Sequence, residues 1–281
     1  MTTPFKAACV QLNAGNDLAA NLAAAGAGIR MAVTQGATFI LTPEYCVMMD
    51  GSGRTMRERA QAPDGGEALA AFRGFARETG AWLLAGSLTC RGGDADPDRI
   101  VNRSFLLRPD GEVAATYDKI HMFDVTLPDG RQIRESSAYR PGDVAVVADT
   151  PWGGLGMTIC YDVRFPGLYR ALAQAGAQYL AVPSSFTAQT GPAHWKELLR
   201  ARAIETTCFV FAPAMCGQHP GNRATHGHSL IIDPWGRVLV EGSDVPGVFV
   251  ADIDPAAVAK ARAMIPSLEH DRAFRVARGP G

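Results

Sequence analysis

The sequence predicts a layered α/β protein, and three observations support this. Short apolar runs alternate with segments of helical periodicity over most of the chain. That order is typical of helices that cover a largely parallel sheet. Arg-Pro-Asp-Gly and Asp-Pro-Trp-Gly turns at 108–111 and 233–236 indicate two hairpins. No stretch is rich enough in Gly, Ser or Pro to be a linker, so we expect one domain over residues 1–281.

The first third of the chain alternates strands and helices. The predicted elements are strands at 6–12, 37–41 and 82–88 and helices at about 17–35 and 67–79. Asp17 is a good N-cap for the first, alanine-rich helix. The apolar run ATFIL at 37–41 is typical of a buried strand, and it ends at Thr42-Pro43-Glu44.

The second half repeats this alternation after a long polar segment. Residues 119–141 lack a clear period and carry a Pro-Asp-Gly turn at 128–130. Loops of that length in a compact domain are usually functional or disordered. The elements predicted after it are strands at 155–159, 179–183 and 208–212 and helices at 165–175 and 193–206. From about residue 264 the chain is charged and contains proline, which predicts an extension that packs on this or another subunit.

Composition excludes several classes of partner. The chain has 281 residues, 47% of them hydrophobic, which is enough to bury a large core, and a formal net charge of -1. There is no basic excess for nucleic acid or an anionic membrane surface. No run approaches the roughly 20 apolar residues of a membrane helix, and the N-terminus lacks the pattern of a signal peptide. We therefore expect a soluble, cytoplasmic protein that acts on a small molecule.

The cysteines and histidines do not form a metal or disulfide pattern. Six cysteines are scattered without C-x-x-C pairs, which favours free thiols in a reducing compartment. Of the six histidines only His226 and His228 are close in sequence, on what could be one face of a strand. Without a third ligand nearby they are better interpreted as hydrogen-bonded core or pocket residues. We expect neither a metal nor another cofactor.

Three polar residues follow apolar strands, where layered α/β proteins commonly place reactive groups. Glu44 comes directly after a buried strand, so desolvation is expected to raise its pKa toward neutrality, although a capping or salt-bridged glutamate fits equally well. Lys119 follows the second strand of the first hairpin, where a lysine is usually only surface charge. Cys160 lies between a strand and a helix whose dipole would favour a thiolate, although most such cysteines are buried structural thiols.

Together these three residues meet the needs of amide hydrolysis. A thiol attacks the carbonyl carbon, a base accepts the thiol proton and returns it to the leaving amine, and a fixed cation stabilises the oxyanion. Cys160, Glu44 and Lys119 supply one group for each task.

The segments around these residues resemble the three catalytic motifs of the nitrilase superfamily of carbon-nitrogen hydrolases. The matching segments are TPEY with Glu44, YDKIHMFD with Lys119 and ICYDVRFP with Cys160, in the same order and with the same wide separations. The similarity extends from about residue 5 to residue 272. The segment RESSAYRPGD resembles the one that carries a fourth polar residue, which maps to Glu135 and which the resemblance implies holds the lysine and orients the substrate.

The resemblance also implies a fold and a substrate class. The superfamily fold is a four-layer αββα sandwich that pairs into dimers, so we expect a homodimer or higher homo-oligomer. The segments GPAHWKELLRARAIET and CGQHPGNRATHGHSLIIDPWGRV are most similar to the Nit branch, particularly its deaminated-glutathione amidases. These form 2-oxoglutarate and cysteinylglycine through a thioester acyl-enzyme, and the related omega-amidases act on 2-oxoglutaramate.

Further residues are expected to shape the site. The backbone N–H of Tyr161 should join Lys119 at the oxyanion, because a turn from strand to helix presents free amides. Arg164 and Arg223 are candidates for a substrate carboxylate, since a guanidinium binds a carboxylate in a bidentate manner; ordinary ion pairing is the alternative for each. The remaining expected pocket residues are Tyr45, Phe123, Phe186 and Thr187.

Other functions remain open at this point. An N-carbamoyl amino acid hydrolase or a true nitrilase would keep the same three residues and differ in its loops. A Cys-His hydrolase of the papain kind would instead use His194 or His226 as its base. A catalytically inactive scaffold would have no need for the three catalytic residues.

Overall fold

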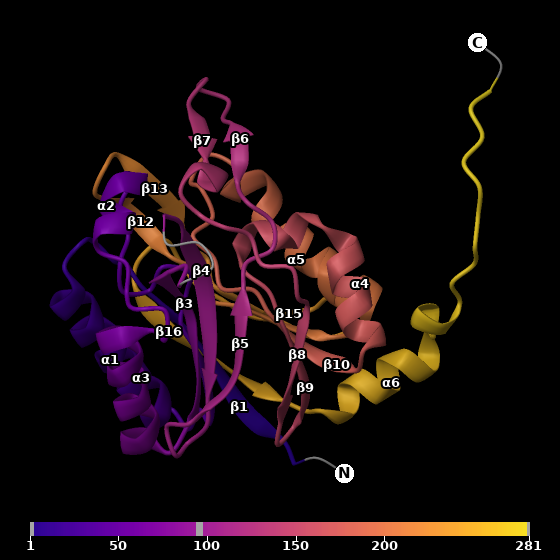
Figure 1. The fold of residues 1–281 in the computed structure, drawn as a ribbon. Coiled ribbons are helices and arrows are strands. Elements are labelled where there is room, and N and C mark those ends of the chain that lie inside the picture. Colours follow the sequence, from indigo (N-terminus) through magenta and orange to yellow (C-terminus); the bar gives the residue numbers. More distant parts are fainter. Residues whose placement is uncertain (1–2, 94–97, 280–281) are drawn as a thin grey trace.

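Two six-stranded sheets packed face to face form the framework of the computed structural model, which describes residues 3–93 and 98–279 (Figure 1). The first sheet has the order β16-β1-β2-β3-β4-β5. Its strands are β1 Phe5–Gln11, β2 Phe39–Leu41, β3 Trp82–Arg91, β4 Ile100–Leu107, β5 Val113–Asp118 and β16 Gly247–Ile253. Strands β1, β2 and β3 are parallel, and the others pair antiparallel to their neighbours.

The second sheet repeats this plan with the order β15-β14-β11-β10-β9-β8. Its strands are β8 Val146–Thr150, β9 Gly153–Met157, β10 Ala177–Ala181, β11 Phe209–Ala212, β14 Leu230–Ile232 and β15 Val238–Glu241. Strands β9, β10 and β11 are parallel at its centre. The two predicted hairpins are confirmed, because β4 pairs antiparallel with β5 and β14 with β15 across their turns.

Helices cover the outer face of each sheet (Figure 1). Helices α1 (Leu18–Thr34) and α3 (Gly66–Thr79) pack on the first sheet, and α4 (Pro166–Gln174) and α5 (Gly191–Thr206) pack on the second. Asp17 caps α1 as predicted, because its side chain accepts a hydrogen bond from the N–H of Ala20. The layers thus run helix, sheet, sheet, helix, and the predicted four-layer αββα sandwich is confirmed.

The strands are apolar on both faces because each sheet is covered on both sides. In β1, Ala7 and Cys9 belong to the core between the sheets, while Ala8 and Val10 pack beneath α1. This two-sided burial explains why the parallel strands appear in the sequence as continuous apolar runs.

The parallel strands also explain where polar residues gather. Glu44 follows β2, Cys160 follows β9 and Ser185 follows β10, each a few residues beyond the carboxyl end of its strand. Lys119 comes directly after β5, which runs in the same direction as β3 because two antiparallel pairings separate them. These ends meet at one edge of the sandwich, where reactive groups are expected in α/β proteins.

Several elements differ from the sequence-based expectation. The segment 119–141 is partly ordered: β6 (Asp124–Thr126) and β7 (Gln132–Arg134) form a hairpin around the predicted Pro-Asp-Gly turn, and a short 3₁₀ helix η1 (Glu135–Ser137) follows. Strand β9 ends at Met157, two residues before the predicted end. Beyond Met157 the chain still lies beside β10, because the N–H of Thr158 donates to the carbonyl of Ala181.

The remaining elements complete the edge of the sandwich and the C-terminal region. They are α2 (Gly53–Glu58), the paired strands β12 (Cys216–His219) and β13 (Arg223–His226), η2 (Cys160–Arg164), α6 (Ala256–Met264) and η3 (Ser267–Glu269). After η3 the chain extends away from the body to residue 279 (Figure 1). Phe274 and Val276 in this tail are each 85% exposed. None of the described helices is both long and apolar enough to cross a membrane.

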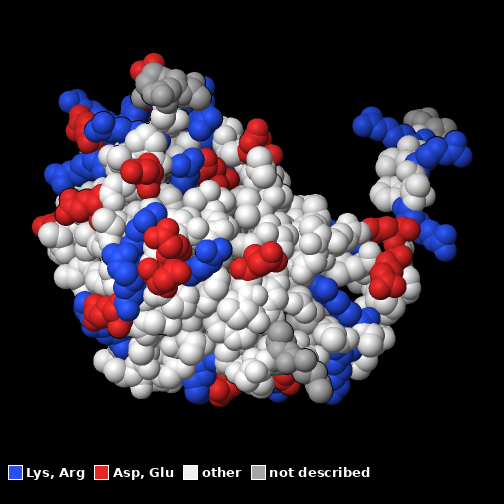
Figure 2. Space-filling view, turned by 60° about the horizontal axis from the view of Figure 1, so that its bottom comes forward, with Lys and Arg blue, Asp and Glu red and all other residues white. Residues whose placement is uncertain are grey.

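The charged residues on the face in Figure 2 are of both signs and interspersed, and a broad area without charge lies beside the tail.

Candidate active site

Glu44 is buried and fully engaged by hydrogen bonds. Its Oε1 accepts hydrogen bonds of 2.9 Å from Lys119 Nζ and from Asn102 Nδ2. Its Oε2 accepts from the backbone N–H and the hydroxyl of Ser185, at 2.8 and 2.6 Å. A carboxylate that is 1% exposed and receives four donors is stabilised in its ionised form.

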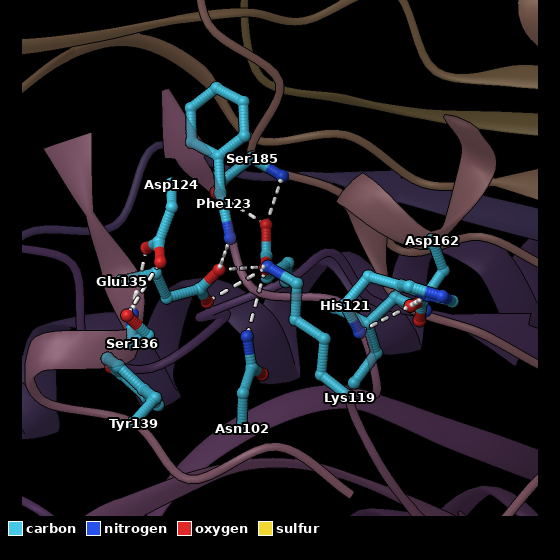
Figure 3. A network of polar contacts seen from close by, with 12 residues as sticks. Asn102, Lys119, His121, Phe123, Asp124, Glu135, Ser136, Tyr139, Asp162 and Ser185 are labelled. Atoms are coloured by element: carbon cyan, nitrogen blue, oxygen red, sulfur yellow. Dashed lines mark hydrogen bonds and ion pairs between the residues drawn. The ribbon is translucent and has the colours of Figure 1, made fainter. Parts of the chain in front are cut away.

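Lys119 joins two carboxylates. Its Nζ donates to Glu44 Oε1 and to both carboxylate oxygens of Glu135, each at 2.9 Å. Figure 3 shows the Lys119 side chain reaching into the centre of this network, with Glu135 to one side and with Ser185 and Asn102 at opposite ends. Burial alone would lower the pKa of Lys119, but the negative charges of Glu135 and Glu44 outweigh it and raise the pKa above its ordinary value. Lys119 is therefore a fixed positive charge.

Glu135 is held in turn by the segment that carries Lys119 and by Tyr45, the neighbour of Glu44. Its Oε2 accepts a 2.6 Å hydrogen bond from the backbone N–H of Phe123, and its Oε1 accepts one of 2.9 Å from the Tyr45 hydroxyl. The 3₁₀ turn η1 begins at Glu135 and directs its side chain inward. These contacts fit a residue that positions the lysine.

Cys160 lies at a sharp turn with a left-handed backbone conformation. Its φ is +47°, which is uncommon for a residue other than glycine, and its N–H donates a 2.9 Å hydrogen bond to the carbonyl of Pro183. The turn continues into η2, so Tyr161 occupies the second position of a helix, where backbone N–H groups have no acceptor within the helix. Such strain is often found where a backbone must present a reactive side chain.

The pKa of Glu44 shifts in the direction opposite to the sequence-based prediction. Burial acts to raise it, as predicted, but the Lys119 charge and the hydrogen bonds from Ser185 and Lys119 outweigh burial and lower the pKa below its ordinary value. The prediction was wrong because the sequence does not reveal that the ammonium lies 2.9 Å from the carboxylate.

The thiol of Cys160 likewise differs from its prediction. Burial and the negative charge of Glu44 raise its pKa, and the opposing effect of Lys119 is smaller. The predicted contribution of a helix dipole is not dominant here, since η2 has five residues and α4 begins only at Pro166. A raised pKa favours the neutral thiol beside a carboxylate and an ammonium, and this suits proton transfer during attack rather than before it.

Asp162 connects the Lys119 segment to the Cys160 turn. Its Oδ1 accepts from the backbone N–H of His121 at 3.0 Å and lies 2.7 Å from His121 Nδ1. Its Oδ2 accepts from the Tyr117 hydroxyl at 2.7 Å and from the N–H of Ile159 at 2.8 Å. The His121 ring stacks on Phe165 at a centroid distance of 3.5 Å. One fully buried carboxylate thus fixes the residues that flank both Lys119 and Cys160.

A cavity of about 250 Å³ opens onto Glu44, Lys119 and Cys160. The sequence-predicted residues that line it are Glu44, Tyr45, Lys119, Phe123, Glu135, Cys160, Tyr161, Phe186, Thr187 and Arg223. Arg164 is not among the lining residues. Its guanidinium lies 5.3 Å from the ring centroid of Phe186 and donates to His194, so it packs behind the aromatic wall.

Arg223 is the better placed of the two arginines predicted to bind a substrate carboxylate. Its Nη2 donates a 3.0 Å hydrogen bond to the Ser185 hydroxyl, and its guanidinium lies 5.7 Å from the ring centroid of Tyr45. It lines the cavity, so a bound carboxylate would meet a guanidinium that is already oriented.

The histidines considered as alternatives lie elsewhere. His226 ends β13, whereas His228 follows it with a φ of +56°, so the two histidines do not share one strand face. Their rings stack on each other at 4.5 Å. His194, His226 and His228 are not among the residues that line the cavity. In the described part of the chain, no group of three His, Cys, Asp or Glu residues is arranged to hold a metal ion.

Sequence reasoning missed Ser185, Asn102 and Asp162. Ser185 follows an apolar strand, so the rule that selected Glu44 and Cys160 applies to it as well. Asn102 is a polar residue inside the apolar strand β4 and is 1% exposed, and a buried amide in a strand signals a specific hydrogen bond. Asp162 was missed because its partners Tyr117 and His121 are more than 40 positions away, and only its contact with the N–H of Ile159 is local.

Comparison with known proteins agrees with this geometry. The family model described as carbon-nitrogen hydrolase matches residues 6–263. The chain is 40% identical to a deaminated glutathione amidase of Yersinia enterocolitica, over 94% of this chain and 92% of that one. Both results confirm the resemblance inferred from the three motifs.

Two sets of solved structures share the fold. The NitFhit protein of C. elegans superposes with a TM-score of 0.89 at 36% identity; the match covers 96% of this chain and 66% of that longer one. A structure of the amidase from Nesterenkonia sp. AN1, described as a nitrilase-superfamily member, has a TM-score of 0.77 at 28% identity, with 95% of this chain and 97% of that one covered. Another structure of that amidase, with a TM-score of 0.76 at 29% identity over 93% and 98% of the chains, shows acrylamide added to its active-site cysteine.

Proposed function

This chain belongs to the carbon-nitrogen hydrolase family, and we propose that it is an amidase in which Cys160 is the nucleophile, Glu44 the general base and Lys119 the oxyanion stabiliser. The observation that carries the proposal is that these three side chains, which follow the separate strands β2, β5 and β9, line one cavity. The active-site cysteine of the Nesterenkonia amidase, a protein of the same fold, supports the assignment of a cysteine nucleophile.

The proposed reaction begins with acylation. As the Cys160 sulfur bonds to the amide carbon, its proton passes to Glu44, and the carbonyl oxygen takes up the negative charge beside the Lys119 ammonium and the Tyr161 N–H. Collapse of this intermediate breaks the carbon-nitrogen bond, and Glu44 gives the proton to the departing amine. The products of this half are a free amine and a thioester on Cys160.

Deacylation repeats these steps with water. Glu44 takes a proton from the attacking water, and the second tetrahedral oxyanion occupies the same position near Lys119. Collapse breaks the carbon-sulfur bond, releases the carboxylic acid and returns the proton from Glu44 to the Cys160 sulfur. Glu135 holds Lys119 throughout, because its carboxylate accepts two hydrogen bonds from Nζ.

For the substrate we propose deaminated glutathione, a 2-oxo acid amide that would be hydrolysed to 2-oxoglutarate and cysteinylglycine. The 40% identity to an enzyme named for this substrate supports the choice. Arg223 offers a guanidinium for the carboxylate of the acyl half, and Tyr45, Phe123 and Phe186 offer apolar walls. Tyr161 and Thr187 complete the proposed substrate site. Arg164 contributes indirectly, because its guanidinium packs on the rings of Tyr161 and Phe186.

The test is a comparison of specificity constants. Purified protein should be assayed with deaminated glutathione, 2-oxoglutaramate, an N-carbamoyl amino acid and a simple nitrile. We expect the highest kcat/KM for deaminated glutathione. A higher value for any of the others would assign the chain to an omega-amidase, carbamoylase or nitrilase activity, and no turnover of any of them would favour a scaffold.

We also propose that the chain folds as one domain with a C-terminal extension and acts as a cytoplasmic homodimer. The tail beyond η3 projects from the body and exposes Phe274 and Val276, which suits packing on a second copy (Figure 1). The six cysteines are free and buried, which fits a reducing compartment. Sedimentation of the full chain against a chain ending at residue 269 tests the role of the tail in the dimer.

A further inference from the structure

A second hollow adjoins the candidate active site. It has a volume of about 310 Å³ and shares Arg131, Ile133, Thr187 and Arg223 with the first cavity. Its other walls come from the turn between β6 and β7, from residues 188–189 and from the β12–β13 hairpin. The two hollows are therefore joined through residues that both of them contain.

The chemistry of the second hollow differs from that of the first. The first contains Cys160, Glu44, Lys119 and aromatic rings. The polar lining of the second consists of two arginines, Arg131 and Arg223, together with Asp129, Thr187 and three side-chain amides, Gln189, Gln218 and Asn222. None of the residues in the second hollow is a nucleophile or a base for the proposed reaction. It offers hydrogen bonds and charge, which are the properties of a binding subsite.

Arg131 is the cation of this hollow that belongs to the β6–β7 turn, whereas Arg223 donates to Ser185 in the first cavity. Its Nη1 donates a 3.0 Å hydrogen bond to the carbonyl of Asn222, and its Nη2 lies 3.5 Å from Asp129 Oδ2. Its side chain is 44% exposed, and a guanidinium carries five N–H groups, so donors remain for a further carboxylate. The contact with Asn222 holds the β6–β7 turn against the β12–β13 hairpin and orients the guanidinium.

Asp129 provides the complementary acceptor. Its carboxylate accepts hydrogen bonds from Gln189 Nε2 and, at 3.0 Å, from the backbone N–H of Arg131. It is 44% exposed, so it can accept further hydrogen bonds from a ligand. An acceptor and a cation side by side match a short peptide, which presents a backbone N–H and a terminal carboxylate.

We propose that the second hollow binds the amine half of an extended amide, with Arg131 recognising a carboxylate at the end of a peptide-like leaving group. This inference rests on the proposed function, since it requires that Cys160 attack an amide in the first cavity. The acyl half then occupies the first cavity and the leaving group extends past Thr187 into the second. A primary amide, whose leaving group is ammonia, has nothing to place there.

The experiment compares two substrates with the same acyl group in the full chain. Deaminated glutathione has a cysteinylglycine leaving group, and 2-oxoglutaramate has ammonia. For Arg131→Ala we expect kcat/KM for deaminated glutathione to fall roughly ten- to hundredfold, mainly through KM, the range for losing a charge-assisted hydrogen bond. The value for 2-oxoglutaramate should remain that of the wild type. Arg237→Ala, at a side chain that is 75% exposed and lines neither hollow, is the matched control.

A third substrate identifies the group that Arg131 binds. Deaminated glutathione that ends in glycinamide lacks the terminal carboxylate, so the wild type should lose as much kcat/KM on it as Arg131→Ala loses on the acid. Arg131→Ala should show no further loss between the acid and the amide. This pattern links the arginine to the carboxylate, and a general structural effect would not produce it.

The outcomes separate the subsite from the proposed function. If Arg131→Ala lowers kcat/KM equally on both substrates, Arg131 binds the carboxylate of the acyl half, and the proposed subsite is overturned. If Arg131→Ala lowers kcat/KM on neither substrate, the subsite is overturned as well. If the wild-type protein hydrolyses 2-oxoglutaramate but not deaminated glutathione, both the extended substrate and the subsite are refuted. The assignment as a cysteine amidase would remain. Absence of turnover on every substrate would refute the proposed function itself.

Discussion

Lys119 donates a 2.9 Å hydrogen bond to Glu44, and the two side chains are only 2% and 1% exposed. With Glu135 on its other side, the ammonium compensates two buried carboxylates at once. Removing one partner of a buried ion pair lowers the free energy of unfolding by more than the pair itself contributes to it, because the remaining charge stays buried without a partner. The same residues are therefore expected to contribute to both activity and stability.

Removing Lys119 tests both contributions. We expect Lys119→Ala to lower kcat at least ~10²-fold, the cost of losing one oxyanion donor. It should also lower the free energy of unfolding by about 3–5 kcal/mol, because Glu44 and Glu135 lose their cation. Lys119→Arg should restore little activity, since a planar guanidinium cannot replace a compact ammonium. Steady-state kinetics and urea unfolding measure the two effects, and an active, fully stable Lys119→Ala protein would contradict the assignment.

Glu44 is expected to control the reactivity of the thiol as well as turnover. Glu44→Gln keeps the shape of the side chain but cannot accept the thiol proton, so amide hydrolysis and alkylation of Cys160 should both slow strongly. Hydrolysis assays and intact-mass analysis after iodoacetamide treatment give the two rates. Lys119→Ala can also slow alkylation, because an ammonium stabilises a thiolate. The informative result is therefore hydrolysis: near wild-type turnover by Glu44→Gln would make Glu44 structural and favour a Cys-His enzyme.

The pH dependence follows from the direction of the two pKa shifts. Because Lys119 and Ser185 lower the pKa of Glu44, its carboxylate persists below the ordinary value of 4.5. The stability contributed by this group is present above that value and is lost as the pH falls through the lower folded pKa. We expect kcat/KM to stay level from neutral pH down to about 5 and to fall only below the ordinary range of glutamate.

The alkaline side of the same profile provides a contrast. Burial and the negative charge of Glu44 raise the pKa of the Cys160 thiol. We therefore expect no inflection in kcat/KM at the pH where an ordinary cysteine thiol ionises. A thiolate-imidazolium pair would instead lose activity as its histidine deprotonates. Rates measured between about pH 5 and 9, with circular dichroism to verify folding, distinguish the two cases.

Asp162 is expected to act through the backbone that it fixes. In the wild type the two carboxylate oxygens of Asp162 both accept hydrogen bonds, but Asp162→Asn keeps only one of these oxygens. The new NH₂ group then faces the N–H of Ile159 or of His121, and two donors cannot hydrogen-bond to each other. We expect a loss of about 1–3 kcal/mol in unfolding free energy, together with a lower kcat. Asp149→Asn, at an exposed position in β8, is the matched control. Wild-type stability and kcat in Asp162→Asn would show that the four contacts are dispensable.

The sequence predicted most of the fold because its signals are local. Apolar runs covered on both faces locate the parallel strands, and the Asp17 cap and the Pro-Asp-Gly turns depend on neighbouring residues. The β6–β7 hairpin was missed because its strands have three residues each, too few to show an apolar alternation. The two-sheet arrangement followed from the family resemblance, since periodicity within a strand does not specify which sheet it joins.

The candidate site was predictable only in part for a related reason. Glu44 and Cys160 follow apolar strands, so their positions are visible locally. The direction of the Glu44 pKa depends on Lys119, which is 75 positions away in sequence, and on Ser185, which is 141 positions away. Burial, the only contribution that the sequence suggested, acts in the opposite direction. The charge balance of the site therefore required the three-dimensional structure.

Cys160→Ser tests the central claim most directly, with Cys46→Ser as its control. Both cysteines are buried, but Cys46 donates to the carbonyl of Ser87 and does not line the cavity. We predict that Cys160→Ser keeps its fold and loses nearly all hydrolysis of deaminated glutathione, because a hydroxyl is far harder to deprotonate than a thiol. Cys46→Ser should hydrolyse it at close to the wild-type rate. Full activity in folded Cys160→Ser would show that Cys160 is not the nucleophile.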